Sequence, residues 1–345
     1  MPIIVRDDMS ARPRDAGLRG AFRTHLAYLE AFARIATEDK AFPEAYRTLD
    51  GRLSRCQHPP VASPIAGRPQ VRRSLESAWG TELLLLMSHR LLTGDEIVGV
   101  SNNWNVVQAY YALYHATQAV LVARGFPRPD SHPKTQRMFF DLWGALPEDP
   151  APWSLSVGAK GHQPTSIQID PRLHPWTSVN TRGCWTIACK ALQTTRADAL
   201  ADRTADARED KRRARRKAWI ETRKRPGAAR DFPLPRLTVD EKAKVNAAIR
   251  SYTVLDYLYR LRVRGNYEDS AMFTDGPEDG SESELVRRCL LRLVATSLYV
   301  AERTLCTAPD GKRTLDDWAR GWCRANVPAE MTLGIAQRVD HWPGP

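Results

Sequence analysis

The sequence predicts an all-α fold, a helical bundle that carries an inserted basic and partly irregular region. Three observations support this prediction. Apolar residues recur at three- and four-residue steps over several long segments, which places them on one face of a helix. Stretches rich in proline and glycine separate these segments. No internal repeat is evident, so the helices must bury their apolar faces against one another.

Composition sets outer limits on the kind of protein. The 345 residues are 42% hydrophobic and 26% charged, which is typical of one large or two ordinary globular domains. Apolar runs such as Leu83 to Met87 are far shorter than the roughly 20 residues that span a bilayer. The N-terminus turns acidic at once, unlike a secretory signal, and the six cysteines form no CxxC pair. We therefore expect a cytoplasmic protein with reduced thiols and no membrane partner.

Residues 1–70 are expected to form an N-terminal arm and one helix. Residues 1–17 are polar and show no periodicity, which predicts an extended arm. A helix is predicted from Leu18 to about Lys40, and prolines in residues 57–70 indicate a long loop. The apolar stripe of this helix comprises Leu18, Phe22, Leu26, Leu29, Phe32 and Ile35.

Residues 71–147 are expected to form the first half of the bundle. One helix runs from about Val71 to Leu92, and another from about Asn103 to Arg124, where Gly125 closes it. The second helix is apolar nearly all round, which predicts a central, buried position. His115 lies inside it, so its imidazole must either find hydrogen-bond partners or face an opening.

Residues 148–237 are expected to form the insertion. Its first part loses the helical pattern and contains a β-prone stretch, 166–169, that suggests a small hairpin; a helix resumes near Arg182. Between Arg203 and Arg230 there are twelve Lys/Arg and four Asp/Glu, so most of the net charge of +11 sits in one segment. Cations beside an aromatic side chain suit nucleic-acid binding, and an acidic protein partner or a salt-bridged helix are the alternatives. The residues concerned are Lys211, Arg212, Arg213, Arg215, Arg216, Lys217 and Trp219.

Residues 238–308 are expected to form the second half of the bundle. Thr238, with Glu241 three residues later, predicts a capped helix that reaches Arg264 and stops at Gly265. A charged loop follows, and a final long helix runs from about Ser283 to Leu305 with Cys289 on its buried face. Residues 309–345 are expected to form a tail with one short helix.

Three segments resemble HEPN domains. Residues 109–125, Ala-Tyr-Tyr-Ala-Leu-Tyr-His-Ala and an aliphatic run to Arg-Gly, are similar to the aromatic helix of that family. Residues 131–139, which begin Ser-His-Pro-Lys-Thr, resemble the segment that follows it. Residues 258–269, Leu-Tyr-Arg-Leu-Arg-Val-Arg-Gly-Asn-Tyr-Glu-Asp, resemble its arginine-rich helix end. The resemblance covers about 71–147 and 238–308.

The chain departs from the family at one point. The nuclease-type signature is an arginine followed four to six residues later by a histidine, but no histidine occurs between His174 and His341. Arg262 is followed instead by Asn266 and Tyr267. A tyrosine with an ordinary pKa near 10 is a poor general base, although it can orient a phosphate or a ribose hydroxyl.

The resemblance implies an RNA-binding or RNA-cleaving protein of a prokaryotic defence or toxin–antitoxin system, working as a homodimer or in a larger complex. His115 would supply the acid or base, Arg262 with Arg264 would stabilise the charge on phosphate, and neither a metal nor a cofactor is expected. Asn266 and Tyr267 complete the candidate catalytic set. Arg260, Arg264, His132 and Lys134 are further candidates for binding nucleic acid.

Other interpretations remain open. The missing histidine favours a non-catalytic subunit in which the helices form a scaffold and the basic insertion holds nucleic acid. A third hypothesis is a nucleotide-sensing module, in which the same cleft binds a small phosphate ligand. The arginines can also complement a helix dipole, His115 can be a core residue, and His132 and Lys134 can cap the next helix. His162, His174, Cys184 and Cys189 match no strong zinc pattern.

Overall fold

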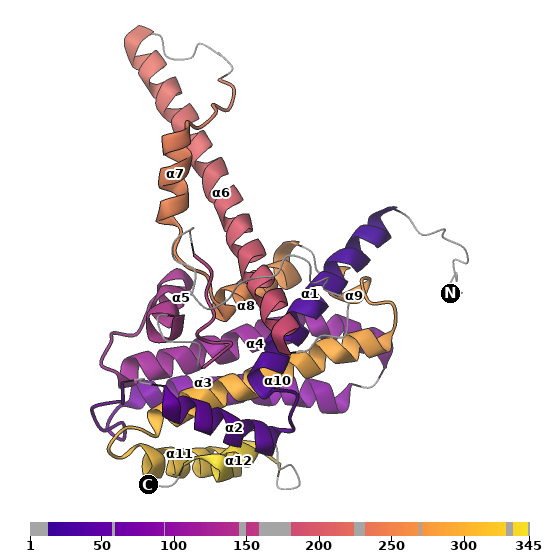
Figure 1. The fold of residues 1–345 in the computed structure, drawn as a ribbon, viewed down its shortest axis with the longest axis vertical. Helices are drawn as coiled ribbons and strands as arrows, with labels where there is room; N and C mark the ends of the chain where they lie inside the picture. Colours follow the sequence, from indigo (N-terminus) through magenta and orange to yellow (C-terminus); the bar gives the residue numbers. More distant parts are fainter. Residues whose placement is uncertain are drawn as a thin grey trace.

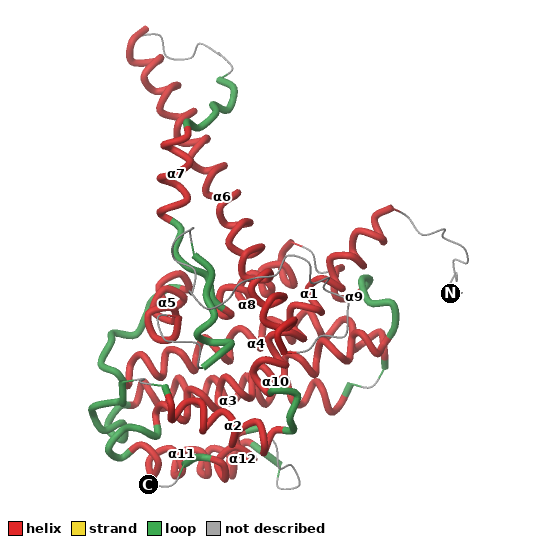
Figure 2. Tube along the Cα trace, viewed as in Figure 1, coloured by secondary structure: helices red, strands yellow, loops and turns green. Residues whose placement is uncertain are grey.

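The computed structural model describes residues 13–56, 59–92, 94–144, 150–158, 181–223, 232–268, 271–328 and 334–343, and it confirms the all-α fold. The regular structure of these residues is helical (Figure 2), and their β-pairing is limited to one antiparallel bridge between Val157 and Tyr252. Among them, no helix is both long and apolar enough to cross a membrane.

Two helices occupy the centre of the bundle. These are α4 (Asp95–Ala123) and α10 (Gly280–Leu305), with α3 (Pro69–Leu91) beside both, and α1 (Pro13–Thr37) and α2 (Phe42–Arg55) packed on α10. Figure 1 shows α3, α4 and α10 running side by side. The predicted burial of the aromatic helix is confirmed, since Tyr110, Leu113 and Val120 are at most 2% exposed. Gly125 ends this helix with a φ of 85°, a conformation that favours glycine.

The elements that surround the aromatic helix are short. They are α5 (His132–Phe139), η1 (Phe140–Gly144), α8 (Val254–Val263), η2 (Arg264–Glu268) and α9 (Ala271–Thr274), and both η1 and η2 are single π-helical turns. Gly265 lets η2 approach α4 closely, because a Cβ there would lie 2.9 Å from Cγ2 of Val106 and 3.3 Å from the carbonyl oxygen of Asn103.

The single helix predicted from Thr238 to Arg264 is wrong, because the chain breaks it into α7 (Val239–Ala248) and α8. The predicted capping box of Thr238 and Glu241 does begin α7. The break comes from a distant partner: the amide of Tyr252 donates to the carbonyl of Val157 at 2.9 Å, which holds the connecting residues extended. Asp256 then accepts from the amide of Thr253 and starts α8.

A long arm projects from the bundle (Figure 1). It consists of α6 (Thr181–Arg223), 43 residues in length, with α7 packed along it. The contacts that hold the pair are polar and near the surface: Lys211 Nζ lies 2.7 Å from Glu241, and Arg208 Nε donates to the Pro235 carbonyl at 3.1 Å. The insertion is therefore more helical than expected between 181 and 223. The β-prone stretch 166–169 lies outside the described residues.

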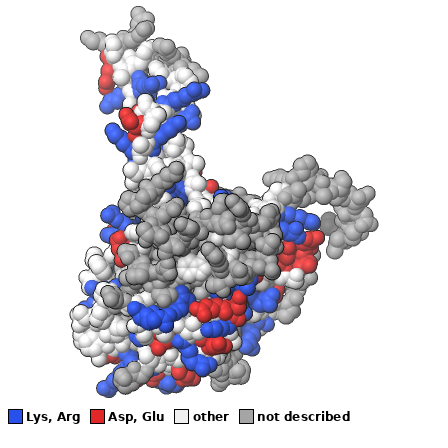
Figure 3. All heavy atoms as spheres, viewed as in Figure 1, with Lys and Arg blue, Asp and Glu red and all other residues white. Residues whose placement is uncertain are grey.

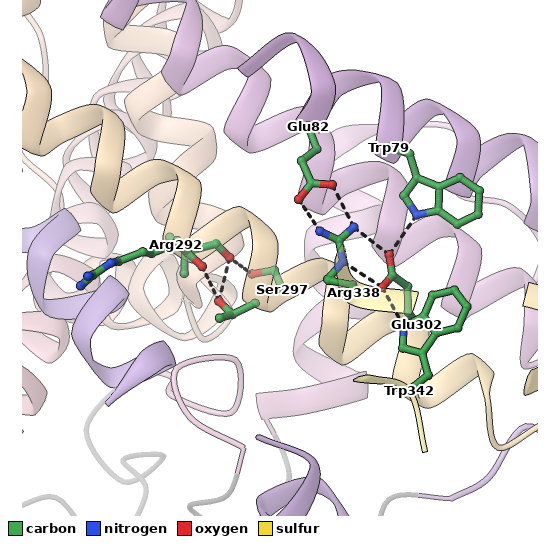
Figure 4. A network of polar contacts seen from close by, with 9 residues as sticks. Trp79, Glu82, Arg292, Ser297, Glu302, Arg338 and Trp342 are labelled. Carbon is green, nitrogen blue, oxygen red and sulfur yellow. Dashed lines mark hydrogen bonds and ion pairs between the residues drawn. The ribbon is translucent and has the colours of Figure 1, made fainter. Parts of the chain in front are cut away.

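The C-terminal segment is also more helical than predicted. It forms α11 (Gly311–Asn326), α12 (Ile335–Arg338) and η3 (Val339–His341), which pack on the bundle. Arg338 is fully buried and forms ion pairs with Glu82 of α3 and Glu302 of α10 (Figure 4). Indole nitrogens of Trp79 and Trp342 donate to Glu302 at 2.9 and 3.1 Å. This network ties the end of the chain to the two long helices.

Candidate functional site

Aromatic side chains, two histidines and one arginine gather where α4, α5 and α8 meet. We call this group the tyrosine–histidine cluster. Its members are Tyr110, Tyr111, Tyr114 and His115 of α4, His132 at the start of α5, and Tyr259 and Arg262 of α8. The helical repeat explains the grouping, because residues three and four positions apart share one face. Three segments distant in sequence thereby contribute to one site.

His132 is held by the tyrosines around it. Its Nδ1 lies 2.7 Å from the hydroxyl oxygen of Tyr110, and its ring centroid lies 4.9 Å from that of Tyr114 and 5.5 Å from that of Tyr259. Burial raises the pKa of Tyr110, so its phenol stays protonated and can donate to Nδ1. In that tautomer the imidazole carries its proton on Nε2. His132 is thus oriented by a side chain of the central helix.

Three tyrosine rings lie around the guanidinium of Arg262. The carbon at the centre of its guanidinium lies 5.1 Å from the ring centroid of Tyr111 and 5.6 Å from those of Tyr110 and Tyr259. These are cation–π distances. Its Nε is buried and has no hydrogen-bond partner among the described residues, and none of their carboxylates forms an ion pair with it. A positioned guanidinium that no described carboxylate pairs with is suited to an incoming phosphate.

His115 lies beside the same rings. It stacks on Tyr111 with centroids 6.0 Å apart and meets the edge of Tyr114 at 5.4 Å. Burial lowers the pKa of His115 to about 4, helped by the nearby Arg128 and, when it is protonated, by His132. Burial, then Arg262, also lowers the pKa of His132. Both imidazoles are therefore neutral at neutral pH, and the buried Nδ1 of His115 has no hydrogen-bond partner within the described part of the chain.

The three arginines predicted to act together are divided between two places. Arg260 and Arg264 face the base of α6, where Asp198 lies 3.7 Å from Arg260 Nε and 3.3 Å from an Arg264 terminal nitrogen. Arg264 also lies 3.0 Å from Nε2 of His25, whose pKa burial lowers to about 3, with Arg264 and Arg260 contributing. Only Arg262 points to the cluster. Arg260 and Arg264 instead join α8 to the arm.

The remaining predicted residues near the bundle lie apart from this cluster. Lys134 is exposed and lies 3.7 Å from Asp130. Asn266 lies in the η2 turn, and the side chain of Tyr267 is outside the described residues. Among the residues considered for zinc, His162 and His174 lie outside the described residues. Burial raises the pKa of the Cys189 thiol to about 12. The described residues contain no group of three or more His, Cys, Asp or Glu that could hold a metal ion.

The basic segment lies on the outer half of the arm, where Figure 3 shows lysines and arginines outnumbering acids. Glu209 lies 2.7 Å from Arg212 and 3.4 Å from Arg213, and these neighbours lower its pKa. Arg215 and Arg216 are exposed and form no ion pair with a described residue. The four others are at least partly paired, Lys211 with Glu241 and Lys217 with Glu221 at 3.9 Å.

Trp219 has a structural role in the arm. Its ring packs edge-on against Phe232, with centroids 5.9 Å apart, which joins α6 to the segment that returns toward α7. The side chain is half-buried. It therefore presents only part of its surface for stacking on a base.

Comparisons with protein-family models, with curated proteins and with solved structures found no significant match. The resemblance to HEPN domains therefore rests on the three sequence segments alone.

Sequence reasoning did not assign a site role to Tyr110, Tyr111, Tyr114 or Tyr259, although all four lie in the segments that carry the resemblance. Their crowding around His132 depends on the packing of α8 against α4, which one sequence does not reveal. A usable signal was the recurrence of tyrosine in both segments at helical spacing.

Proposed function

We propose that this chain is a HEPN-like protein that binds and cleaves RNA without a metal ion. The observation that carries the proposal is the meeting of His115, His132 and Arg262 in one aromatic cluster. An internal phosphoryl transfer of RNA requires one neutral imidazole as base, one imidazole that becomes protonated as acid, and a cation for the phosphate; here Arg262, which no described carboxylate pairs with, is that cation. The basic arm supplies the attraction to the RNA backbone.

In the proposed reaction the ribose 2′-hydroxyl attacks the adjacent phosphorus. His115, neutral because burial lowers its pKa to about 4, accepts the hydroxyl proton as the bond from the 2′ oxygen to phosphorus forms. The bond from phosphorus to the 5′ oxygen breaks, and His132, protonated in the phosphate complex, donates the proton on Nε2 to that oxygen and returns to its neutral form. A bound phosphate offsets the charge of Arg262 and so raises the pKa of His132 toward the value that an acid needs.

Arg262 stabilises the negative charge that develops on the phosphate. Arg264 was expected to share this task, but its pairing with Asp198 leaves the task to Arg262. By the resemblance, the chain works in a prokaryotic defence or toxin–antitoxin system as a homodimer or as a subunit of a larger complex.

The test is incubation of the purified protein with end-labelled single-stranded RNA in EDTA. Wild type is compared with His115→Ala and with His89→Ala, a matched control because His89 is a partly exposed histidine of α3 outside the cluster. Cleavage by wild type and the control, with a loss of about 100-fold or more in His115→Ala, supports the proposal. Equal cleavage by all three proteins would remove His115 from the mechanism.

A non-catalytic nucleic-acid-binding subunit is the second candidate. It is favoured by the absence of a histidine four to six residues after Arg262. In that case the arm still binds RNA, and the cluster only shapes the surface beside it. Saturable RNA binding by wild type without any cleavage, in EDTA and in magnesium, would establish this candidate over the nuclease.

A further inference from the structure

A cavity of about 770 Å³ lies at the base of the arm, next to the tyrosine–histidine cluster. Residues of α5, α6 and α8 and the link between α7 and α8 form its walls. The side chains that matter for its chemistry are Gln136, Arg137, Arg203, Tyr252 and Tyr259. Its volume is within the range of small-molecule sites.

The walls carry positive charge that is only partly compensated. Four arginines line the cavity, and the two aspartates that line it are Asp202 and Asp256. Asp256 is 2% exposed and is held by Arg250 in a two-point ion pair, so both charges of that pair are engaged. Arg260 lies 3.7 Å from Asp198, which leaves Arg137 of α5 and Arg203 of α6.

Arg137 and Arg203 are available to an anion. Both are exposed, one on α5 and the other on α6, and neither forms an ion pair with any residue that the structure describes. Arginine has a planar set of donors that matches the oxygens of a phosphate. Two such groups from different elements can therefore hold one phosphate between the arm and the bundle.

The side-chain amide of Gln136 offers the cavity a further hydrogen-bond donor. It is only 5% exposed, and its Oε1 accepts a hydrogen bond from Arg250 at 3.0 Å. Its Nε2 is buried and has no partner among the described residues. Buried amides are rarely left unpaired in folded proteins. A carbonyl or ring nitrogen of a bound base is an acceptor of the kind that this amide lacks.

We propose that this cavity binds one nucleotide, with its phosphate between Arg137 and Arg203, its base edge at Gln136 and its base against Tyr252 or Tyr259. The nucleotide is either a unit of an RNA strand or a free nucleoside monophosphate, which present the same chemistry. In its RNA form the inference rests on the proposed function. Tyr259 links the two sites, since its ring centroid lies 5.5 Å from that of His132. The nucleotide beside the cleaved bond then selects the cleavage position.

The first experiment measures binding of the four nucleoside monophosphates by titration calorimetry. Wild type is compared with the double variant Arg137→Gln/Arg203→Gln and with Arg73→Gln/Arg313→Gln, which removes the same charge from exposed positions outside the cavity. We expect saturable binding to wild type and to the control, and affinity at least about tenfold weaker in the cavity variant. Equal affinity in all three proteins would overturn the proposal.

The second experiment uses a 2′-O-methyl RNA trinucleotide, which lacks the attacking hydroxyl. An RNA source predicts tighter binding of the trinucleotide than of any monophosphate, and a free-nucleotide source predicts the reverse order. Gln136→Met, which removes the amide at similar volume, should change the order of preference among bases. The site would be refuted if Gln136→Met left the order of preference among bases unchanged and if binding did not depend on Arg137 or Arg203.

The two proposals fail in different ways. Monophosphate binding that depends on Arg137 and Arg203, in a protein that neither cleaves nor binds RNA, supports the cavity and rejects the proposed function. RNA cleavage that depends on His115, with the same base preference in wild type and in both cavity variants, supports the function and rejects the cavity.

Discussion

The hydroxyl oxygen of Tyr110 lies 2.7 Å from Nδ1 of His132, which fixes a histidine at the start of α5 against the central helix. Tyr110 is completely buried, whereas His132 is only half-buried. The buried residue therefore sets the orientation, and the histidine presents its other nitrogen outward. If the cluster is catalytic, this hydrogen bond decides which nitrogen of His132 faces the substrate.

Tyr110→Phe should separate orientation from packing. The phenylalanine retains the ring, so we expect a loss of stability of only about 1 kcal/mol, while cleavage falls roughly five- to tenfold because His132 loses its fixed orientation. The measurements are single-turnover cleavage and denaturant unfolding. Tyr28→Phe is the matched control, since the Tyr28 hydroxyl contacts Thr194 outside the cluster. Equal cleavage by both variants would show that the bond to His132 has no part in the reaction.

Arg262 and Arg264 should give opposite results despite their proximity in sequence. Arg262→Ala is expected to abolish cleavage with the fold and RNA affinity mostly kept, because rings rather than carboxylates hold this side chain. Arg264→Ala is expected mainly to lower stability, because it removes the contact to Nε2 of His25 and the nearer of the two arginines on Asp198. Cleavage assays and thermal unfolding of both variants test this. Loss of cleavage in Arg264→Ala at unchanged stability would contradict the assignment.

Acidification should destabilise the fold through its buried histidines. The pKa of His115 falls from 6.5 to about 4 on folding and that of His25 to about 3, in both cases mainly through burial. Between the folded and unfolded values the unfolded chain binds more protons, so the free energy of unfolding rises with pH in this window and falls on acidification. His115→Gln should flatten that dependence between pH 6.5 and about 4. An identical slope in wild type and variant would disprove the lowered pKa.

Neutralising the arm should weaken RNA binding without unfolding the bundle. Replacing Arg212, Arg213, Arg215 and Arg216 by Gln leaves the contact of Lys211 with Glu241 intact. We expect the dependence of affinity on salt to become shallower by roughly 0.7 per lost phosphate contact, with little change in thermal stability. Filter binding over a series of salt concentrations measures the slope. The same slope in wild type and variant would place the RNA elsewhere on the protein.

The buried ion network should be essential for stability. Arg338→Met leaves Glu82 and Glu302 without their cation, and we expect a loss of about 3–5 kcal/mol. Burial already raises the pKa of Glu82 against the effect of Arg338. The control is Arg320→Met, which removes an exposed ion pair to Asp316 and should cost no more than about 1 kcal/mol. Similar losses in the two variants, by denaturant unfolding, would contradict the structural role.

The sequence predicted those features that depend on neighbouring residues. The burial of the aromatic helix, its end at Gly125 and the capping box at Thr238 all follow from local patterns, and the structure confirms each. The break between α7 and α8 was not predicted, because its cause is the pairing of Tyr252 with Val157, almost a hundred residues away. The division of the arginines follows from helix geometry, since positions 260 and 264 share a face and 262 does not.

The candidate site was foreseeable only in part. His115, His132 and Arg262 were named from their segments, but their meeting depends on how α5 and α8 pack on α4. The buried Arg338 lies in a segment expected to be a tail, because an isolated arginine gives no sign that two distant carboxylates surround it.

The length of α6 separates the basic segment from the tyrosine–histidine cluster, which under the proposed function are the two places that RNA contacts. About 13 residues separate Asp198, which contacts α8, from Lys211, and at 1.5 Å per residue this corresponds to roughly 20 Å along the helix axis. An oligonucleotide too short to span this distance touches the tyrosine–histidine cluster or the basic segment, but not both. The arm can therefore act as a gauge of strand length, raising the capture of long molecules while leaving the reactivity of short fragments unchanged.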